Sequence, residues 1–117
     1  MGQVKGLLSA YKNEKGDAEN RFADNVISNL LYENGSMESD LRALSKKSAD
    51  LKKRGAELHN LVKNKKEYQM KMSEVLSQLT CLNSFLEFVL NKMPDRANEY
   101  NIVIDENNSY LNLHKIN

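Results

Sequence analysis

The chain has 117 residues, and its 17 Lys and Arg nearly balance 16 Asp and Glu, so a net charge of +1 excludes a chain that is strongly acidic or basic overall. Hydrophobic residues make up 40% and charged residues 28%, with one Pro and no Trp, which favours long amphipathic helix over sheet in a single small domain. The only cysteine, Cys81, excludes an intrachain disulfide and a cysteine-based zinc site.

The first segment, residues 1–22, contains three glycines and lacks a sustained helical repeat. We expect it to be a flexible or weakly helical lead-in. It has no apolar core of a signal peptide, and no part of the chain approaches the run of about 18 apolar residues that a transmembrane helix needs. The sequence therefore predicts a soluble intracellular protein without membrane contact.

From residue 23 to 93, apolar residues recur at alternating spacings of three and four, the period of a coiled-coil seam. With Ile27 at position a, nine of ten d positions but only five of ten a positions are apolar. We expect an all-α fold in which one helix of about 105 Å joins partner helices in an oligomeric bundle. The expected seam, which would bind these partners, comprises Ile27, Leu30, Met37, Leu41, Leu44, Leu51, Leu58, Val62, Met72, Leu76, Leu79, Leu86 and Leu90.

The a column is interrupted by residues such as Ser48, Gly55 and Asn83. A polar a residue specifies register or partner but lowers stability, which argues against a simple homodimer. From Leu61 onward the g positions also become apolar, so the face widens enough to contact more than one partner helix, in a homo- or hetero-oligomer. This second apolar face comprises Leu61, Tyr68, Val75, Leu82, Phe85, Phe88 and Val89.

Two positions interrupt the expected helix. The turn-prone residues 34–36 include a good N-cap, yet the heptad phase continues across them, so either a kink or a break is expected. Pro94 should end the rod, because it disfavours helical geometry in the residue before it. Residues 94–117 then form a polar tail, for which Ile102-Val103-Ile104 suggests a short strand, with a short helix or disorder as alternatives.

Basic residues are concentrated between Arg42 and Lys66, where nine basic and two acidic residues leave a local excess of +7. One interpretation is a solvated flank that pairs with acidic flanks of partner helices. The other is contact with the phosphate backbone of a nucleic acid such as DNA, although no aromatic residues are interleaved there for base stacking. The candidate contacts are Lys46, Lys47, Lys52, Lys53, Arg54, Lys63 and Lys66.

No pattern in the chain indicates catalysis. His59 and His114 are 55 residues apart and form no HxxxH or HExxH motif, so a metal site is not expected. Cys81 lies in an apolar stretch without a nearby histidine, which indicates a buried structural thiol. Without a phosphate-binding loop or a nucleophile elbow, we expect no enzyme, no cofactor and no small-molecule substrate.

A family resemblance is carried by the runs Ile27-Ser28-x-Leu30-x-Tyr32, Glu38-x-Asp40-Leu41, Ser45-Lys46 and Ala56-x-Leu58. They resemble the testis-expressed protein 12 family of synaptonemal complex central element components, and Ser84-Phe85-Leu86 matches an Asn-Phe-Leu of that family after a one-residue shift. The resemblance implies a nuclear, chromosome-associated scaffold that pairs with another central element helix in meiosis. The 24 residues after Met93 depart from the family pattern. Kinetochore, vesicle-tethering and cytoskeletal adaptor complexes use similar rods and remain alternatives.

Overall fold

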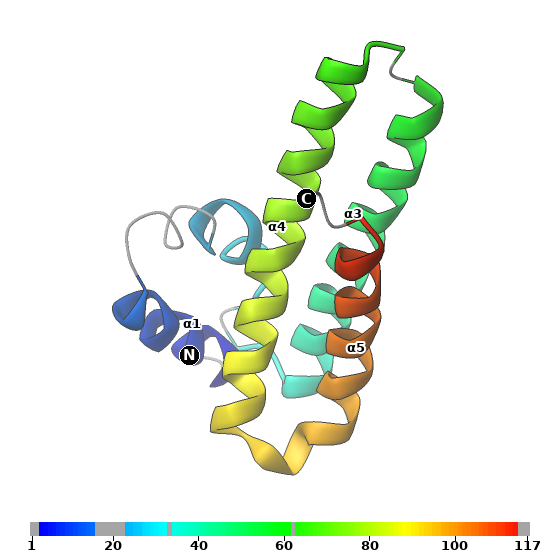
Figure 1. Cartoon of the computed structure of the whole chain (residues 1–117). Coiled ribbons are helices and arrows are strands. Elements are labelled where there is room, and N and C mark those ends of the chain that lie inside the picture. Colours follow the sequence, from blue (N-terminus) through cyan, green and yellow to red (C-terminus); the bar gives the residue numbers. More distant parts are fainter. Residues whose placement is uncertain (1–2, 16–22, 33, 62, 115–117) are drawn as a thin grey trace.

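The computed structural model describes residues 3–15, 23–32, 34–61 and 63–114, and every regular element in these ranges is helical. The long helices are α3 (Met37–Leu61), α4 (Lys65–Lys92) and α5 (Ala97–Leu113). Before them come α1 (Gln3–Glu14) and the π-helical turn η1 (Ala23–Ile27), and the 3-10 turn η2 (Pro94–Arg96) joins α4 to α5 (Figure 1). The predicted all-α fold is confirmed.

The long helices form a compact bundle. Figure 1 shows α3 and α4 as the two arms of a hairpin, with α5 running back beside them. The molecule measures 45 × 29 × 24 Å, whereas one helix over residues 23–93 would be about 105 Å long. The prediction of a single long helix is wrong, because the chain leaves helical geometry between η1 and α3 and again between α3 and α4.

Polar side chains explain both breaks, since each caps the helix that follows. The Asn64 side-chain oxygen accepts hydrogen bonds from the backbone N–H groups of Lys66, at 2.9 Å, and Glu67, at 3.4 Å. Ser36 Oγ likewise accepts from the backbone N–H of Ser39 at 3.1 Å. These contacts satisfy amides that the first turn of a helix leaves unpaired. Of the two alternatives for residues 34–36, the break is correct.

The d column of the heptad pattern forms the core between α3 and α4. Burial of each Leu or Met side chain stabilises the fold by about 1.5–3 kcal/mol. The residues that were expected to meet another chain therefore pack against each other. Their side chains are all at most 7% exposed: Met37, Leu44, Leu51, Leu58, Met72, Leu79 and Leu86.

The segment after Pro94 is the third long helix of the bundle. Tyr100, Val103 and Ile104 of α5 are buried at spacings of three and one, which places them on one helical face, whereas Ile102 is 61% exposed. A strand through residues 102–104 would alternate its side chains and separate Val103 from Ile104. Packing against α3 and α4 thus overrides the β propensity of this run, and the helix alternative is correct.

Two polar residues of the a column, Ser48 and Asn83, face α5. Ser48, Asn83 and Asn107 are all at most 4% exposed. The Asn107 side-chain amide donates to Ser48 Oγ at 3.0 Å and to the Asn83 side-chain oxygen at 3.3 Å, and the Asn83 amide donates to Asn108 at 2.8 Å. These bonds join three helices, and a slipped alignment would leave Ser48 and Asn83 without this donor, in addition to the Asn107 side-chain oxygen, which has no partner among the described residues. Ser48 and Asn83 are therefore paired within the chain by α5, whereas the a residues Asn34 and Gln69 are exposed.

Gly55, another a position, makes room for α5. A methyl group there would overlap the hydroxyl oxygen of Tyr110. We expect Gly55→Ala to lower the free energy of unfolding by about 1 kcal/mol, although the same change inside a helix ordinarily raises it by about 0.5–1 kcal/mol. Adding Tyr110→Phe should recover the loss.

The matched control for this prediction is Gly6→Ala in α1, because nothing lies within 4 Å of that added methyl group. Urea denaturation of the variants gives the comparison. If Gly55→Ala stabilises the protein as much as Gly6→Ala does, the expected overlap is not present in solution.

The N-terminal segment is anchored on α4. Val4, Leu8 and Tyr11 of α1 are buried on one helical face. The Tyr11 ring meets the rings of Phe85 and Phe88 edge-on, each with centroids 5.5 Å apart. Such pairs contribute about 0.5–1.5 kcal/mol beyond burial. Of the flexible and weakly helical alternatives for residues 1–22, the helical one describes α1, while residues 16–22 lie outside the described ranges.

Candidate functional site

The predicted seam lies inside the chain's own bundle. Ile27 is buried with the d residues of α3 and α4, and the half-buried members pack against them: Leu30, Leu41, Leu76 and Leu90. Val62 lies outside the described residues. A partner helix could reach this seam only if the bundle opened. In this structure, the seam is not a free binding surface.

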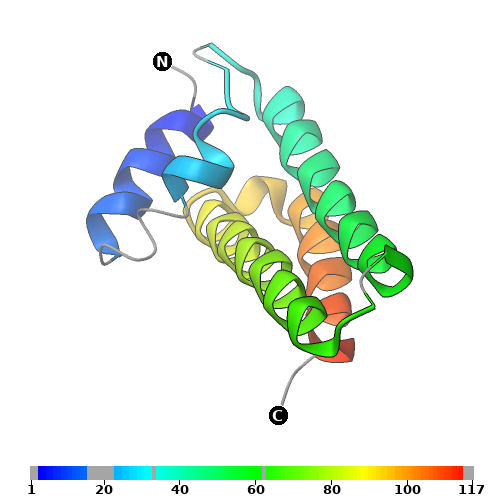
Figure 2. The ribbon, with the colours of Figure 1, turned by 90° about the horizontal axis from the view of Figure 1, so that it is seen from above.

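The second apolar face is covered largely by the N-terminal elements. Figure 2 shows α4 between these elements, α1 and η1, and the other long helices. Two predicted members differ from the rest: Tyr68 is half-buried and Leu61 is 74% exposed. Both lie near the α3–α4 connection, so only this end of the predicted face is open. The buried members are at most 9% exposed: Val75, Leu82, Phe85, Phe88 and Val89.

Basic side chains follow the outer face of α3 and the connection to α4. Arg42, Lys46 and Lys53 are separated by four and seven residues, which places them within a stripe about 40° wide and about 16 Å long. This stripe lies opposite the buried residues of α3. We define the basic face as the stripe with its exposed or half-exposed neighbours: Arg42, Lys46, Lys47, Lys53, Arg54, Lys63, Lys65 and Lys66.

The charge of the basic face is not compensated by the rest of the described chain. None of its eight side chains forms an ion pair within the described ranges. The adjacent Lys52 approaches Glu106 only to 4.0 Å. Residues 67–114 contain seven acidic and three basic residues, so the near-neutral chain combines a basic segment with an acidic one. Apart from Glu106 of α5 beside Lys52, the acidic flanks expected on partner helices are therefore not supplied by α4 or α5.

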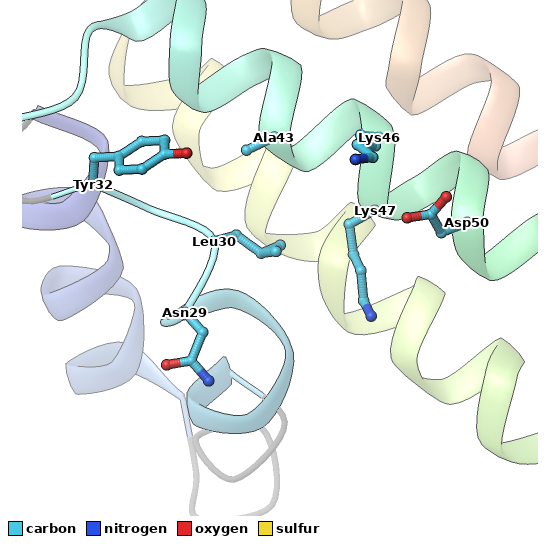
Figure 3. Close-up of a pocket in the computed structure, with 7 residues that line it drawn as sticks. All are labelled: Asn29, Leu30, Tyr32, Ala43, Lys46, Lys47 and Asp50. Atoms are coloured by element: carbon cyan, nitrogen blue, oxygen red, sulfur yellow. The ribbon is translucent and has the colours of Figure 1, made fainter.

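A shallow groove of about 340 Å³ borders the basic face. Figure 3 shows Ala43, Lys46, Lys47 and Asp50 on α3, facing the loop that follows η1. The loop contributes Asn29, Leu30 and the 67% exposed Tyr32. Two amines and one carboxylate at its edge make the groove an extension of the basic face.

The fold brings together the two histidines that the sequence separates by 55 residues. The ring centroids of His59 and His114 are 6.0 Å apart. Tyr68 flanks His59 at 4.9 Å, and Tyr110 flanks His114 at 4.3 Å. The Tyr68 hydroxyl also lies 3.0 Å from His59 Nε2, within hydrogen-bond distance. We call these four side chains the ring row; because three helices supply them, no spacing rule along the sequence predicts it.

Asp40 is a buried acid near the start of α3. Its side chain is 0% exposed, and neither carboxylate oxygen has a hydrogen-bond partner in good geometry among the described residues. Burial raises the pKa of the Asp40 carboxyl, and the backbone of Tyr32 partly offsets that effect. The ionised carboxylate therefore opposes folding.

Replacing this acid with its neutral isostere should stabilise the protein at neutral pH. Because the folded-state pKa of Asp40 lies above the unfolded value, its contribution favours folding at low pH and is lost as the pH rises through the folded-state pKa. Asp40→Asn should thus raise Tm at pH 7 and change it little near about pH 3. Calorimetry across this range, with the exposed Asp50→Asn as control, tests this; equal Tm shifts in both variants would contradict it.

Within the described ranges, no group of three or more His, Cys, Asp or Glu side chains is placed to hold a metal ion. No helix there is long and apolar enough to cross a membrane. Cys81 is a buried thiol that forms no disulfide among the described residues, and its predicted burial is confirmed. Comparisons with protein-family models, curated proteins and solved structures found no match to this chain. The resemblance to the synaptonemal complex family therefore stays a prediction.

Proposed function

We propose that this protein is a non-catalytic binding module that holds a nucleic acid by its phosphate backbone along the basic face. The observation that carries the proposal is a set of eight cationic side chains without ion pairs, along α3 and the α3–α4 connection, in the part of the chain that the structure describes. Contacts to phosphates require only positive charge at suitable spacing, and the binding they provide is independent of base sequence.

The bundle geometry supports this assignment over helix pairing through the seam. The core residues Leu44, Leu79 and Leu86 are each 0% exposed, so the seam already has its partners. The outer face of α3 makes no such contacts, because the buried residues of α3 lie on the opposite side of the helix. A stripe about 16 Å long on this helix presents Arg42, Lys46 and Lys53 together.

The proposal is tested with the triple variant Arg42→Gln, Lys46→Gln and Lys53→Gln. Fluorescence anisotropy with a labelled oligonucleotide, measured between about 50 and 200 mM salt, gives the affinity and its salt dependence. We expect weaker binding and a salt slope shallower by about 0.9 for each phosphate that the variant no longer neutralises. Because the three residues are at the surface, circular dichroism should show an unchanged helical fold.

The matched control removes three positive charges elsewhere. The control variant is Lys12→Gln, Lys15→Gln and Lys92→Gln, in α1, just after α1 and at the end of α4. Lys12 pairs with Asp24, and Lys15 and Lys92 lie over the rings of Tyr11 and Phe88, so circular dichroism must show that this variant also keeps its fold. This control should bind almost as tightly as the unmodified protein. Equal losses in both triple variants would mean that only net charge matters, and an unmodified protein that fails to bind at low salt would refute the proposed function.

A structural scaffold is the second candidate. It is favoured by two apolar side chains, Leu61 and Met70, which are 74% and 67% exposed. They would give a partner helix an apolar contact site near the α3–α4 connection. In the context of the family resemblance, that partner would be a central element helix in the nucleus. Light scattering of the isolated chain and of Leu61→Ser with Met70→Ser tests it; a purely monomeric unmodified chain would remove self-assembly from this candidate.

A further inference from the structure

The ring row lies beside the lysines of the α3–α4 connection. His59 is in the last turn of α3, four residues before Lys63, and Tyr68 is in the first turn of α4, two residues after Lys66. Tyr110 and His114 reach this place from the end of α5. Planar rings from three helices thus stand next to side chains that bind phosphate, a combination that the sequence pattern did not predict.

The spacing within the ring row is uneven. The outer pairs have centroid separations of 4.9 and 4.3 Å, whereas the central pair, His59 and His114, is separated by 6.0 Å. A base stacked between two rings needs about 3.4 Å on each face, or about 6.8 Å in total. The two central rings are tilted by 36° to each other, so they would have to turn parallel and move apart by about 1 Å to hold one base.

The position of His114 allows that widening. His114 lies one residue beyond the end of α5, where its half-buried ring packs on Tyr110 alone among the residues of α5, and the preceding Leu113 is 80% exposed. His59 is itself exposed. A shift of the His114 ring needs no change in the packing of the buried residues of α5.

We propose that the ring row stacks an unpaired base of a single-stranded nucleic acid, while the lysines of the basic face hold the adjoining phosphates; this rests on the proposed function. Stacking on aromatic rings accepts any base, because every base has a π-face. In a duplex the bases are paired and stacked inside the helix, so the ring row cannot reach them. The protein then binds single strands more tightly than duplexes of the same sequence.

The experiment compares a labelled single-stranded oligodeoxynucleotide with its duplex by fluorescence anisotropy, using the full chain. We expect the unmodified protein to bind the single strand about tenfold more tightly. His59→Ala with His114→Ala should remove this preference and leave duplex affinity unchanged. His59→Phe with His114→Phe keeps both rings without the imidazole nitrogens, and it should retain the preference.

The outcomes separate the two proposals. Equal affinity of the unmodified protein for single strand and duplex overturns the stacking inference and leaves the proposed function standing. A loss of single-strand and duplex binding together in the alanine variant also overturns it, because the rings would then serve the fold. Binding of neither nucleic acid by the unmodified protein overturns the proposed function and the inference with it.

Discussion

Leu79→Glu combined with Leu86→Glu is expected to unfold the isolated chain. Both side chains are 0% exposed in the core of the bundle. An unpaired carboxylate placed there costs several kcal/mol at each position, against a total stability of about 5–15 kcal/mol for a typical domain. Circular dichroism should show the loss of helix, and light scattering an expanded or aggregated chain.

The same double change distinguishes the bundle from the seam that the heptad pattern predicted. If the seam were shared between chains, the double variant would lose association, and the Tm of the unmodified protein would rise with protein concentration. If the core lies within one chain, the Tm of the unmodified protein is independent of concentration. The matched control, Leu61→Glu with Ile102→Glu, changes side chains that are 74% and 61% exposed and should leave the helical content intact. A double core variant that stays helical and melts cooperatively would disprove the buried positions of Leu79 and Leu86.

Asn107→Leu is expected to lower the free energy of unfolding by about 1–3 kcal/mol. Asn107 is 0% exposed and donates to both Ser48 and Asn83, so its loss leaves a buried oxygen on Asn83 without that donor. Urea denaturation should show a lower midpoint with an unchanged m-value. The exposed Asn101→Leu on the same helix is the control and should change stability little.

A compensating variant makes this test sharper. The triple variant adds Ser48→Ala and Asn83→Leu to Asn107→Leu, so that the three bonded polar side chains are removed together. Apolar replacement of a whole network is often neutral or stabilising. We therefore expect the triple variant to recover much of the stability. If Asn107→Leu alone is as stable as the unmodified protein, the three side chains are not bonded to each other in solution.

The heptad pattern predicted which residues are buried better than it predicted where the chain reverses. An antiparallel hairpin presents its d residues to the same core as a straight coiled coil would, so Met37–Leu58 and Met72–Leu86 keep one phase in either arrangement. The reversal depends on the local capping by Asn64, which a heptad count does not register.

Long-range contacts account for what the sequence pattern missed. Tyr11 reaches Ser84, 73 residues away, and Asn107 reaches Ser48, 59 residues away. His59 and His114 are too far apart in sequence to form a local metal-binding or base-stacking motif, yet their ring centroids lie 6.0 Å apart. Each pairing depends on how three helices are oriented, which local periodicity does not specify.

The sequence by itself determined the helical class, the buried d column and the basic segment between Arg42 and Lys66, because these follow from local periodicity and composition. Only the tertiary structure decided that the seam closes within one chain, that α5 meets the buried polar a positions, and that a ring row adjoins the basic face. The physical reason is that an apolar helical face can be buried equally well against a helix of another chain or against a helix of the same chain. Which of the two forms depends on whether the turns let the helices fold back on each other.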